Sequence, residues 1–363
     1  MSTKTCRTCI LPETSLFPLD ASGNCKLCNS PSLLKHIVKK PDLEELERLI
    51  AQIKQNGKNR DFDCIVGWSG GRDSTFMIHE LVRKYNLRCA AVFGRTPFTP
   101  IEITDNVHAI ADKLDIKLVE IETPANHREI AGYCLKKYLE TRTPILINLA
   151  CASCKFINRE IFRQAKRLSI KTIIYGGNRY EYFPSGPASI DIDSENRYSF
   201  ANMLRDNFLR LAKGVKVLAA SPALFKHLYT FFAASVLYVN QYTVFLRLRY
   251  PGIILFDYYH YADWDEGKML EVLKNLEWQL PPGCNSTWRA DCVFEAVKNT
   301  AFKNQLGFSY GQAMYSNLIR AGKITREEAF ARLEKESISE LRLHEALKLC
   351  GLPEDSFDDI KSK

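Results

Sequence analysis

The chain has 363 residues, of which 46% are apolar and 25% charged, so it describes an ordinary globular protein and not a disordered or low-complexity chain. This length accommodates one large α/β domain with attachments, or two domains. The net charge of +8, from 50 basic and 42 acidic residues, suits acidic ligands such as nucleotides, although the excess is mild and dispersed.

The first three parts of the chain differ in pattern. Residues 1–38 carry four cysteines among turn-forming residues, and residues 39–59 have the spacing of a linker helix. Over residues 60–290, short apolar runs alternate with helical patterns, which indicates a parallel sheet covered by helices on both faces. The expected strands are 62–67, 89–93, 116–121, 172–175 and 253–258, and the expected helices are 73–85, 104–114, 130–140 and 156–168.

The remaining pattern is mainly helical. We expect a helical insertion over about 185–250 and a C-terminal helical region over 291–363, where Thr325 and Glu328 predict a capping box. Basic residues interrupt the most apolar stretch, 215–239, so a buried or amphipathic helix is expected there and no transmembrane segment. The N-terminus lacks the apolar run of a signal peptide, and we expect a cytoplasmic protein.

The most informative motif is Ser69-Gly70-Gly71-Arg72-Asp73-Ser74, between an expected strand and an expected helix. Its glycines leave backbone N–H groups uncovered, and the N-terminus of a helix favours an anion, so the turn predicts a phosphate site. It is not a Walker A motif, because GxxxxGK followed by Ser or Thr does not occur. Gly176-Gly177-Asn178 follows another expected strand, and ligands of parallel sheets bind beyond such carboxyl ends.

Two CxxC pairs near the N-terminus predict a structural zinc ribbon. Cys6 and Cys9 are followed, after fifteen residues, by Cys25 and Cys28. Two such turns present four thiolates to one tetrahedral ion, and a closed four-cysteine site is structural. A module this small cannot bury a core of its own, so the metal would supply its folding free energy.

A third pair, Cys151 and Cys154, has no second CxxC partner. It can be read as a redox dithiol, as part of a metal or iron–sulfur site with a distant third cysteine, or as inert buried thiols. The candidate third ligands are Cys292, which we favour because functional types of side chain surround it in sequence, and Cys284.

The Ser69 to Ser74 motif resembles the signature SGGxDS of the PP-loop, or N-type ATP pyrophosphatase, superfamily, whose members release pyrophosphate and use AMP as an activating group. The resemblance implies an adenine nucleotide alpha-hydrolase-like domain whose loop holds the leaving pyrophosphate and in which Asp73 helps to hold Mg²⁺. Arg72 replaces the usual Lys and keeps its charge. The resemblance implies catalytic roles for Arg72, Asp73 and Ser74, and ATP binding by Ser69, Gly70, Gly71, Arg72, Asp73, Ser74 and Phe93, the last beside the adenine.

Four features together resemble the N-acetyl sugar amidotransferases of bacterial surface-glycan biosynthesis. Two of them are the Ser69 to Ser74 loop and Cys151-x2-Cys154 followed by Gly176-Gly177-Asn178. The others are the run from Cys6 to Thr14 continued by Asp20-x2-Gly23-x-Cys25-x2-Cys28, and Asp291-Cys292 followed by Gly307-Phe308 and Ser316-x3-Arg320-x-Gly322-x2-Thr325-Arg326-Glu327-Glu328-Ala329. This resemblance spans nearly the whole chain.

The resemblance implies an enzyme that converts the acetamido group of a nucleotide-linked sugar, or of a related acidic sugar, into an acetamidino group, in lipopolysaccharide or related glycan biosynthesis. ATP would adenylate the amide oxygen, and ammonia would displace AMP. Asn178 and Glu181 are candidate contacts to the substrate or magnesium, and Arg289 could pair with an acidic sugar or a diphosphate. The chain lacks a glutaminase-type cysteine nucleophile, so a separate glutaminase and a cyclase-like subunit would supply ammonia.

The leading alternative is a tRNA-modifying PP-loop enzyme such as a thiolase, which would use the CxxC pair and the distant cysteine. The dispersed basic residues give no dense stripe for nucleic acid, so we do not expect such a partner. A non-catalytic zinc scaffold is a third reading, which the intact SGGxDS loop disfavours. The expected cofactors are ATP, Mg²⁺ and Zn²⁺, with a 4Fe–4S cluster as an option at the third pair.

Overall fold

The computed structural model describes residues 4–181, 226–335 and 339–361. Five parallel strands form one sheet in the order β3-β2-β1-β4-β5, which confirms the predicted α/β class. The strands are β1 (Cys64–Trp68), β2 (Cys89–Arg95), β3 (Lys117–Glu122), β4 (Thr172–Tyr175) and β5 (Ile254–Asp257). Each begins and ends within two residues of its predicted range.

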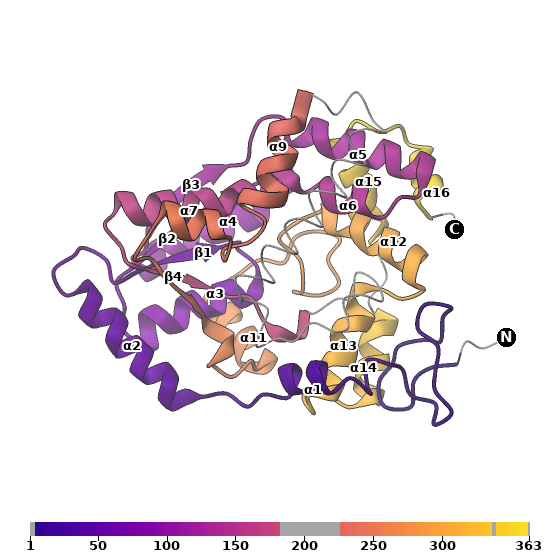
Figure 1. The fold of residues 1–363 in the computed structure, drawn as a ribbon, viewed down its shortest axis with the longest axis horizontal. Coiled ribbons are helices and arrows are strands. Elements are labelled where there is room, and N and C mark those ends of the chain that lie inside the picture. The colour runs from indigo at the N-terminus through magenta and orange to yellow at the C-terminus, as the bar shows by residue number, and fades with distance from the viewer. Residues whose placement is uncertain (1–3, 182–225, 336–338, 362–363) are drawn as a thin grey trace.

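Helices and short helical turns make up most of the remaining described chain (Figure 1). The α-helices are α1 (Pro31–Ile37), α2 (Leu43–Gly57), α3 (Arg72–His79), α4 (Ile101–Leu114), α5 (His127–Thr141), α6 (Ile145–Leu149), α7 (Phe156–Arg167), α9 (Leu228–Phe232), α10 (Val244–Arg249), α11 (Glu266–Asn275), α12 (Phe294–Leu306), α13 (Tyr310–Arg320), α14 (Arg326–Lys335), α15 (Glu340–Leu349) and α16 (Ser356–Lys361). The shorter turns are η1 (Glu80–Lys84), η2 (Ala152–Lys155), η3 (Arg179–Glu181), η6 (Ala233–Leu237) and η7 (Tyr258–His260).

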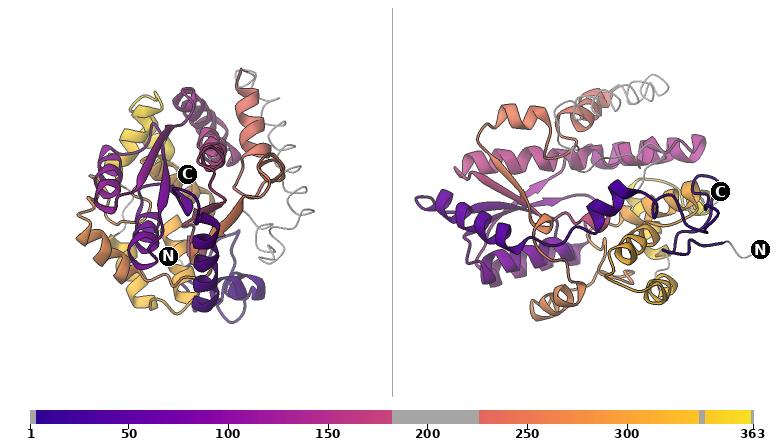
Figure 2. Two further views of the ribbon diagram at one scale, coloured as in Figure 1. Left: turned by 90° about the vertical axis from the view of Figure 1, so that its left-hand side faces the viewer. Right: turned by 60° about the horizontal axis from the view of Figure 1, so that its bottom comes forward.

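Alternation along the central strands buries both faces of the sheet (Figure 2). Val66 of β1 and Ala91 of β2 belong to a core that includes residues of α3 and α4. Their neighbours Ile65 and Val92 belong to a second core, which includes residues of α7. Since successive strand residues point to opposite faces, this burial requires helices above and below the sheet.

Two predicted helical features differ in detail. The expected helix over 73–85 is α-helical only to His79 and continues as the π-helical turn η1, where the Tyr85 N–H donates to the Glu80 carbonyl at 3.0 Å. Hydrophobic spacing does not signal such a widened turn. Thr325 accepts the Glu328 N–H at 3.1 Å, as predicted, but the Glu328 carboxylate pairs with Arg332 instead of completing the capping box.

The expected insertion over 185–250 and the apolar stretch 215–239 fall partly outside the described residues. The described part, from residue 226 onward, contains α9, η6 and α10. Within the described residues, no helix combines the length and apolar character that a membrane crossing requires.

The N-terminal cysteine module lies against the C-terminal helices α13 and α14, at the right of Figure 1. Phe17 and Phe308 pack edge to face with ring centroids 5.1 Å apart, and both are fully buried. The N-terminal module therefore shares one core with the sheet and with helices α13 and α14, and the first 38 residues are not an isolated appendage.

Candidate active site and cysteine centres

The Ser69 to Ser74 loop leaves the carboxyl end of β1 and enters α3 directly, as the sequence predicts. The Ser69 and Ser74 hydroxyls lie 3.2 Å apart, and the Ser69 hydroxyl also accepts the Gly71 N–H at 3.3 Å. Gly71 caps α3 without a side chain, so the first N–H groups of the helix have no capping oxygen. This is the geometry of an anion site at a helix N-terminus.

Gly70 meets a conformational and a steric requirement at once. Its φ is +80°, and a Cβ at this position would lie 2.6 Å from Cγ2 of Ile103 and 2.8 Å from Cγ2 of Val107. The indole of Trp278 donates to the Gly70 carbonyl at 3.0 Å from the other side. The loop is therefore held between α4 and the segment that follows α11.

We expect Gly70→Ala to destabilise the protein by about 1–3 kcal/mol, because alanine resists positive φ and the methyl group would displace α4. Urea unfolding would measure the loss, and ATP affinity should fall with it. Gly177→Ala is the matched control, since nothing lies within 4 Å of its added Cβ. Equal stability of the two variants would contradict this account of the loop.

Arg72 is buried and turned toward other parts of the protein, and only 2% of its side chain is exposed. Its guanidinium donates to Asp73 at 2.8 Å, to Glu266 of α11 at 2.6 Å and to Thr287 at 3.2 Å. In this arrangement Arg72 fixes the loop against α11 and does not present its charge at the loop surface. A direct contact from Arg72 to a bound pyrophosphate would require the side chain to move.

The Asp73 carboxylate joins three parts of the fold. One oxygen accepts from Arg72, and the other accepts from the Asn178 amide and, at 3.0 Å, from the Trp264 indole. The Tyr259 hydroxyl donates to the Asp73 carbonyl at 2.7 Å. Asp73 therefore connects the loop to two segments. One follows β4 and contains Asn178, and the other follows β5 and contains Tyr259 and Trp264.

Glu181 and Arg289 form an ion pair beside this network. Arg289 donates to Glu181 at 2.8 Å, and the Trp288 indole donates to the other Glu181 oxygen at 3.2 Å. Burial raises the pKa of Glu181, while Arg289 opposes this effect. Asp291 stands next to the loop, since a methyl group on Gly71 would lie 3.3 Å from its carboxyl carbon. The structure thus brings Asn178, Glu181 and Arg289 to the loop.

The side chain of Phe93, the residue that the superfamily resemblance places beside the adenine, does not line the site. It is fully buried in the core between the sheet and helices α3 and α4. A ring enclosed in this way cannot stack on an adenine. Alternation along β2 places it inward, because Ala91 and Phe93 share a face of the sheet.

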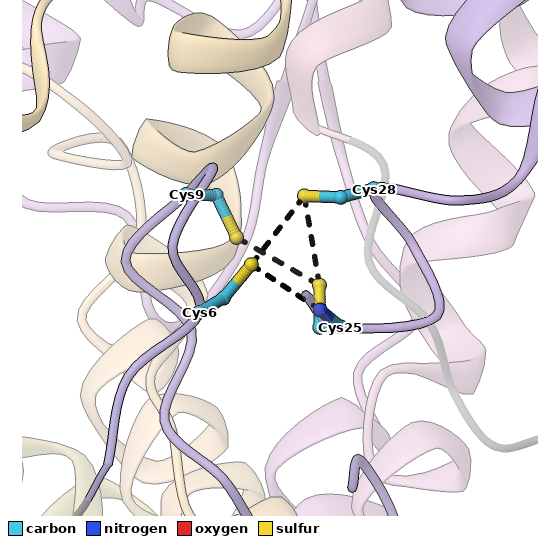
Figure 3. A group of neighbouring side chains, drawn as sticks. All are labelled: Cys6, Cys9, Cys25 and Cys28. Atoms are coloured by element: carbon cyan, nitrogen blue, oxygen red, sulfur yellow. Dashed lines mark hydrogen bonds between the residues drawn. The ribbon is translucent and has the colours of Figure 1, made fainter. Parts of the chain in front are cut away.

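The four N-terminal cysteines converge on one point, as the CxxC spacing predicts (Figure 3). Their sulfur atoms all lie within 4.8 Å of one another. The Cys6–Cys28, Cys9–Cys25 and Cys25–Cys28 sulfur pairs are separated by 3.7, 3.8 and 3.7 Å. A tetrahedral ion with metal–sulfur bonds of about 2.3 Å requires such separations, so the donor set fits zinc.

Two arginines from the C-terminal region complete the surroundings of this centre. Arg320, at the end of α13, donates to Cys9 at 3.1 Å, to Cys28 at 3.2 Å and to Cys25 at 3.5 Å. Arg326 donates to the backbone carbonyls of Cys6 and Cys9. Cationic donors offset the negative charge of four thiolates and orient them. The motif around Arg320 and Arg326 therefore serves the N-terminal centre.

Cys151, Cys154 and Cys292 lie in one region, whereas Cys284 packs in a different core. A hydrogen bond from the Cys154 thiol lowers the pKa of Cys151 to about 6, and burial raises the pKa of Cys292 to about 12. Among the described residues, the N-terminal centre is the only group of three or more ligand atoms within 4.8 Å of one another. The three thiols therefore do not converge on a single ion.

His127 lies next to Cys154 and is completely buried. Its Nδ1 is 3.0 Å from the Thr123 hydroxyl, and its Nε2 is 3.7 Å from the Cys154 sulfur. Burial lowers the pKa of His127 to about 4, and the nearby Lys298 contributes in the same direction. The ring is therefore neutral at pH 7.

We expect this histidine to make stability depend on pH. Its contribution is complete above pH 6.5 and is lost as the pH falls toward 4, because only the unfolded chain gains the proton in this range. The loss amounts to about 3 kcal/mol. Urea unfolding at a series of pH values would show it, and His127→Gln should reduce the pH dependence. An unchanged slope in that variant would contradict the assignment.

Sequence patterns did not reveal four residues that hold the site together. Trp264 and Tyr259 bind Asp73, Glu266 binds Arg72, and Lys298 lies beside Cys151. All four follow the loop by more than 180 residues. Asp291, by contrast, belongs to a run that the sequence does single out.

No family model matches the chain. A curated relative, described as an uncharacterized protein of Methanocaldococcus jannaschii, is 21% identical over 350 residues, which cover 96% of this chain and 99% of that protein. The match therefore runs over nearly the full length of both proteins.

Three solved structures resemble the chain weakly. NMN synthetase from Francisella tularensis has a TM-score of 0.33 at 12% identity, covering 90% of this chain and 98% of its own. The U34-tRNA thiolase of Methanococcus maripaludis with its 4Fe–4S cluster has a TM-score of 0.32 at 16% identity and 96% coverage of both chains. The NH3-dependent NAD synthetase of Campylobacter jejuni has a TM-score of 0.28 at 14% identity, covering 52% and 92%. We rest no functional conclusion on likenesses this distant.

Proposed function

We propose that this chain is an ATP-dependent amidotransferase that converts the acetamido group of a sugar into an acetamidino group. One observation carries the proposal: the Ser69 to Ser74 loop lies next to the Glu181–Arg289 pair. Asn178 connects the two, because its amide donates to Asp73 and its oxygen accepts the Glu181 N–H. One side of this site suits a leaving diphosphate, and the other offers polar and charged groups to a second substrate.

The proposed reaction has two steps. The amide oxygen attacks the α-phosphorus of ATP, the bond to the β-phosphate breaks, and diphosphate leaves. Ammonia then adds to the imidate carbon, the carbon–oxygen bond breaks, and AMP carries away the original amide oxygen. The free N–H groups at the start of α3 and the hydroxyls of Ser69 and Ser74 would bind the diphosphate.

Metal ions have two places in this proposal. Mg²⁺ would neutralise the ATP phosphates, and Asp291, next to Gly71, is a candidate carboxylate for it because both Asp73 oxygens already accept hydrogen bonds. Zn²⁺ would hold the N-terminal module together. Ammonia would come from a separate glutaminase acting with a cyclase-like subunit.

The test combines the protein with ATP, ammonium and a panel of acetamido sugars and nucleotide sugars. We expect AMP and a product one mass unit lighter, because an NH group replaces an oxygen. Mass spectrometry would detect both. If no sugar yields AMP whereas unmodified tRNA does, the amidotransferase proposal is wrong.

A tRNA thiolase remains the second candidate, and the thiol region favours it. Cys151 has a lowered pKa and accepts a hydrogen bond from the Cys154 thiol, with Cys292 and Lys298 nearby. Such a group suits sulfur chemistry or an iron–sulfur cluster. Iron and sulfide analysis of anaerobically prepared protein, together with salt-dependent tRNA binding, would distinguish this candidate.

A further inference from the structure

A cavity beside the Glu181–Arg289 pair has no assigned role. Three parts of the chain form its wall. They are the segment 283–289, the first turns of α12, which contribute Glu295 and Asn299, and the start of α15, which contributes Ser339 and Arg342. Helices α12 and α15 pack against each other, at the right of Figure 1. The cavity thus lies where the C-terminal helices meet the chain that carries Arg289.

Arg342 is a buried cation in this wall, with 7% exposure. It donates to the Arg289 carbonyl at 3.4 Å and to the Ala290 carbonyl at 3.2 Å, and its Nε has no partner among the described residues. The Nε of Arg289 likewise has none. Each guanidinium therefore keeps hydrogen-bonding capacity for an acceptor that the described residues do not provide.

Arg342 is the cation of the wall that no carboxylate pairs with among the described residues. Arg289 pairs with Glu181 at 2.8 Å, and Glu295, the one carboxylate of the wall, lies 3.8 Å from the Lys298 ammonium. The ten-residue helix α15 also begins at this cavity, with Ser339 as its N-cap. The positive end of that helix adds to the field of the two arginines.

The cavity adjoins the proposed nucleotide site. Arg289 in its wall is two residues from Asp291, whose carboxyl stands beside Gly71 of the loop. Glu181, the ion-pair partner of Arg289, follows Asn178, which binds Asp73. A substrate anchored in the cavity would therefore extend toward the loop.

We propose that this cavity binds an oxyanion carried by the sugar substrate, with Arg342 and Arg289 as its donors. The inference rests on the proposed function, because it takes the second substrate to be a sugar. The oxyanion is either the carboxylate of an acidic sugar or the diphosphate of a nucleotide sugar, which guanidinium groups bind in the same way. Anchoring a non-reacting group positions the acetamido group for attack.

Calorimetry with three probes tests the proposal: UDP-N-acetylglucosamine, N-acetylglucosaminuronic acid and neutral N-acetylglucosamine. We expect at least one charged probe to bind more tightly than the neutral sugar. Arg342→Gln should weaken that binding about tenfold or more. Ser286→Glu should do the same by adding a carboxylate to the wall, and Ser286 has no hydrogen bond among the described residues that the substitution would remove. Arg163→Gln on α7, an exposed arginine, is the control that should bind normally.

The probes also identify the source of the oxyanion. Tighter binding of only the uronic acid assigns the carboxylate, and tighter binding of only the UDP sugar assigns the diphosphate. The proposal is overturned if charged probes bind no better than the neutral sugar, or if both cavity variants bind them as the wild type does. If charged probes bind in a way that depends on Arg342 but no AMP forms, the cavity proposal stands and the amidotransferase proposal fails. If AMP forms efficiently from neutral sugars alone, the amidotransferase proposal stands and the cavity proposal fails.

Discussion

Replacing Asp73 with asparagine should reduce AMP formation by about a hundred- to a thousandfold, which is the scale for losing one preorganised electrostatic group. The carboxylate simultaneously accepts from Arg72, Asn178 and Trp264. Asparagine has the same shape but loses the charge and one acceptor. The loop would lose its attachment to the end of β4, and the phosphates of ATP would be held less accurately.

The measurements are the rate of AMP formation, with kcat and KM for ATP separated, and ATP binding by calorimetry. A positioning role predicts a loss mainly in kcat with the fold retained. Asp112→Asn, at an exposed carboxylate on α4, is the matched control and should behave as the wild type. Normal turnover by Asp73→Asn would remove the loop from the mechanism.

Replacing Cys25 with serine should abolish metal binding at the N-terminal centre and lower stability by at least about 3 kcal/mol, part of the 10–16 kcal/mol that structural zinc supplies to small domains. Cys25 is fully buried, and its sulfur lies 3.8 Å from that of Cys9 and 3.7 Å from that of Cys28. Without the metal, Arg320 would lose the thiolates that offset its charge.

Elemental analysis would measure the bound metal, and thermal unfolding the stability. The expected change in Tm is roughly 6 °C or more. Cys350→Ser is the control, because Cys350 lies outside the N-terminal centre. Retention of one zinc ion per chain by Cys25→Ser, with an unchanged Tm, would show that the four sulfurs do not form a metal centre.

Sequence patterns predicted those parts of the structure that depend on residues close together in the sequence. The apolar runs gave all five strands, since buried parallel strands need continuous apolar sequence. The spacing of Cys6, Cys9, Cys25 and Cys28 gave the converging sulfurs, because each CxxC turn sets its own geometry.

Long-range partners could not be predicted in this way. The loop position of Arg72 suggested a phosphate contact, but Glu266, 194 residues later, holds its guanidinium. The position of Phe93 at a strand end suggested a ligand contact, but the packing of α3 and α4 against the sheet encloses it. The sequence around Arg72 or Phe93 does not indicate these contacts, because only the tertiary fold brings the residues together.

The contact between Arg320 and the cysteine centre has a consequence for synthesis on the ribosome. Cys28 and Arg320 are 292 residues apart, so the first cysteines emerge long before their guanidinium partner exists. Folding from the N-terminus would leave this centre unfinished until nearly the whole chain had been translated. We therefore expect nascent chains of increasing length to release their metal to a chelator until the segment containing Arg320 and Arg326 has left the exit tunnel.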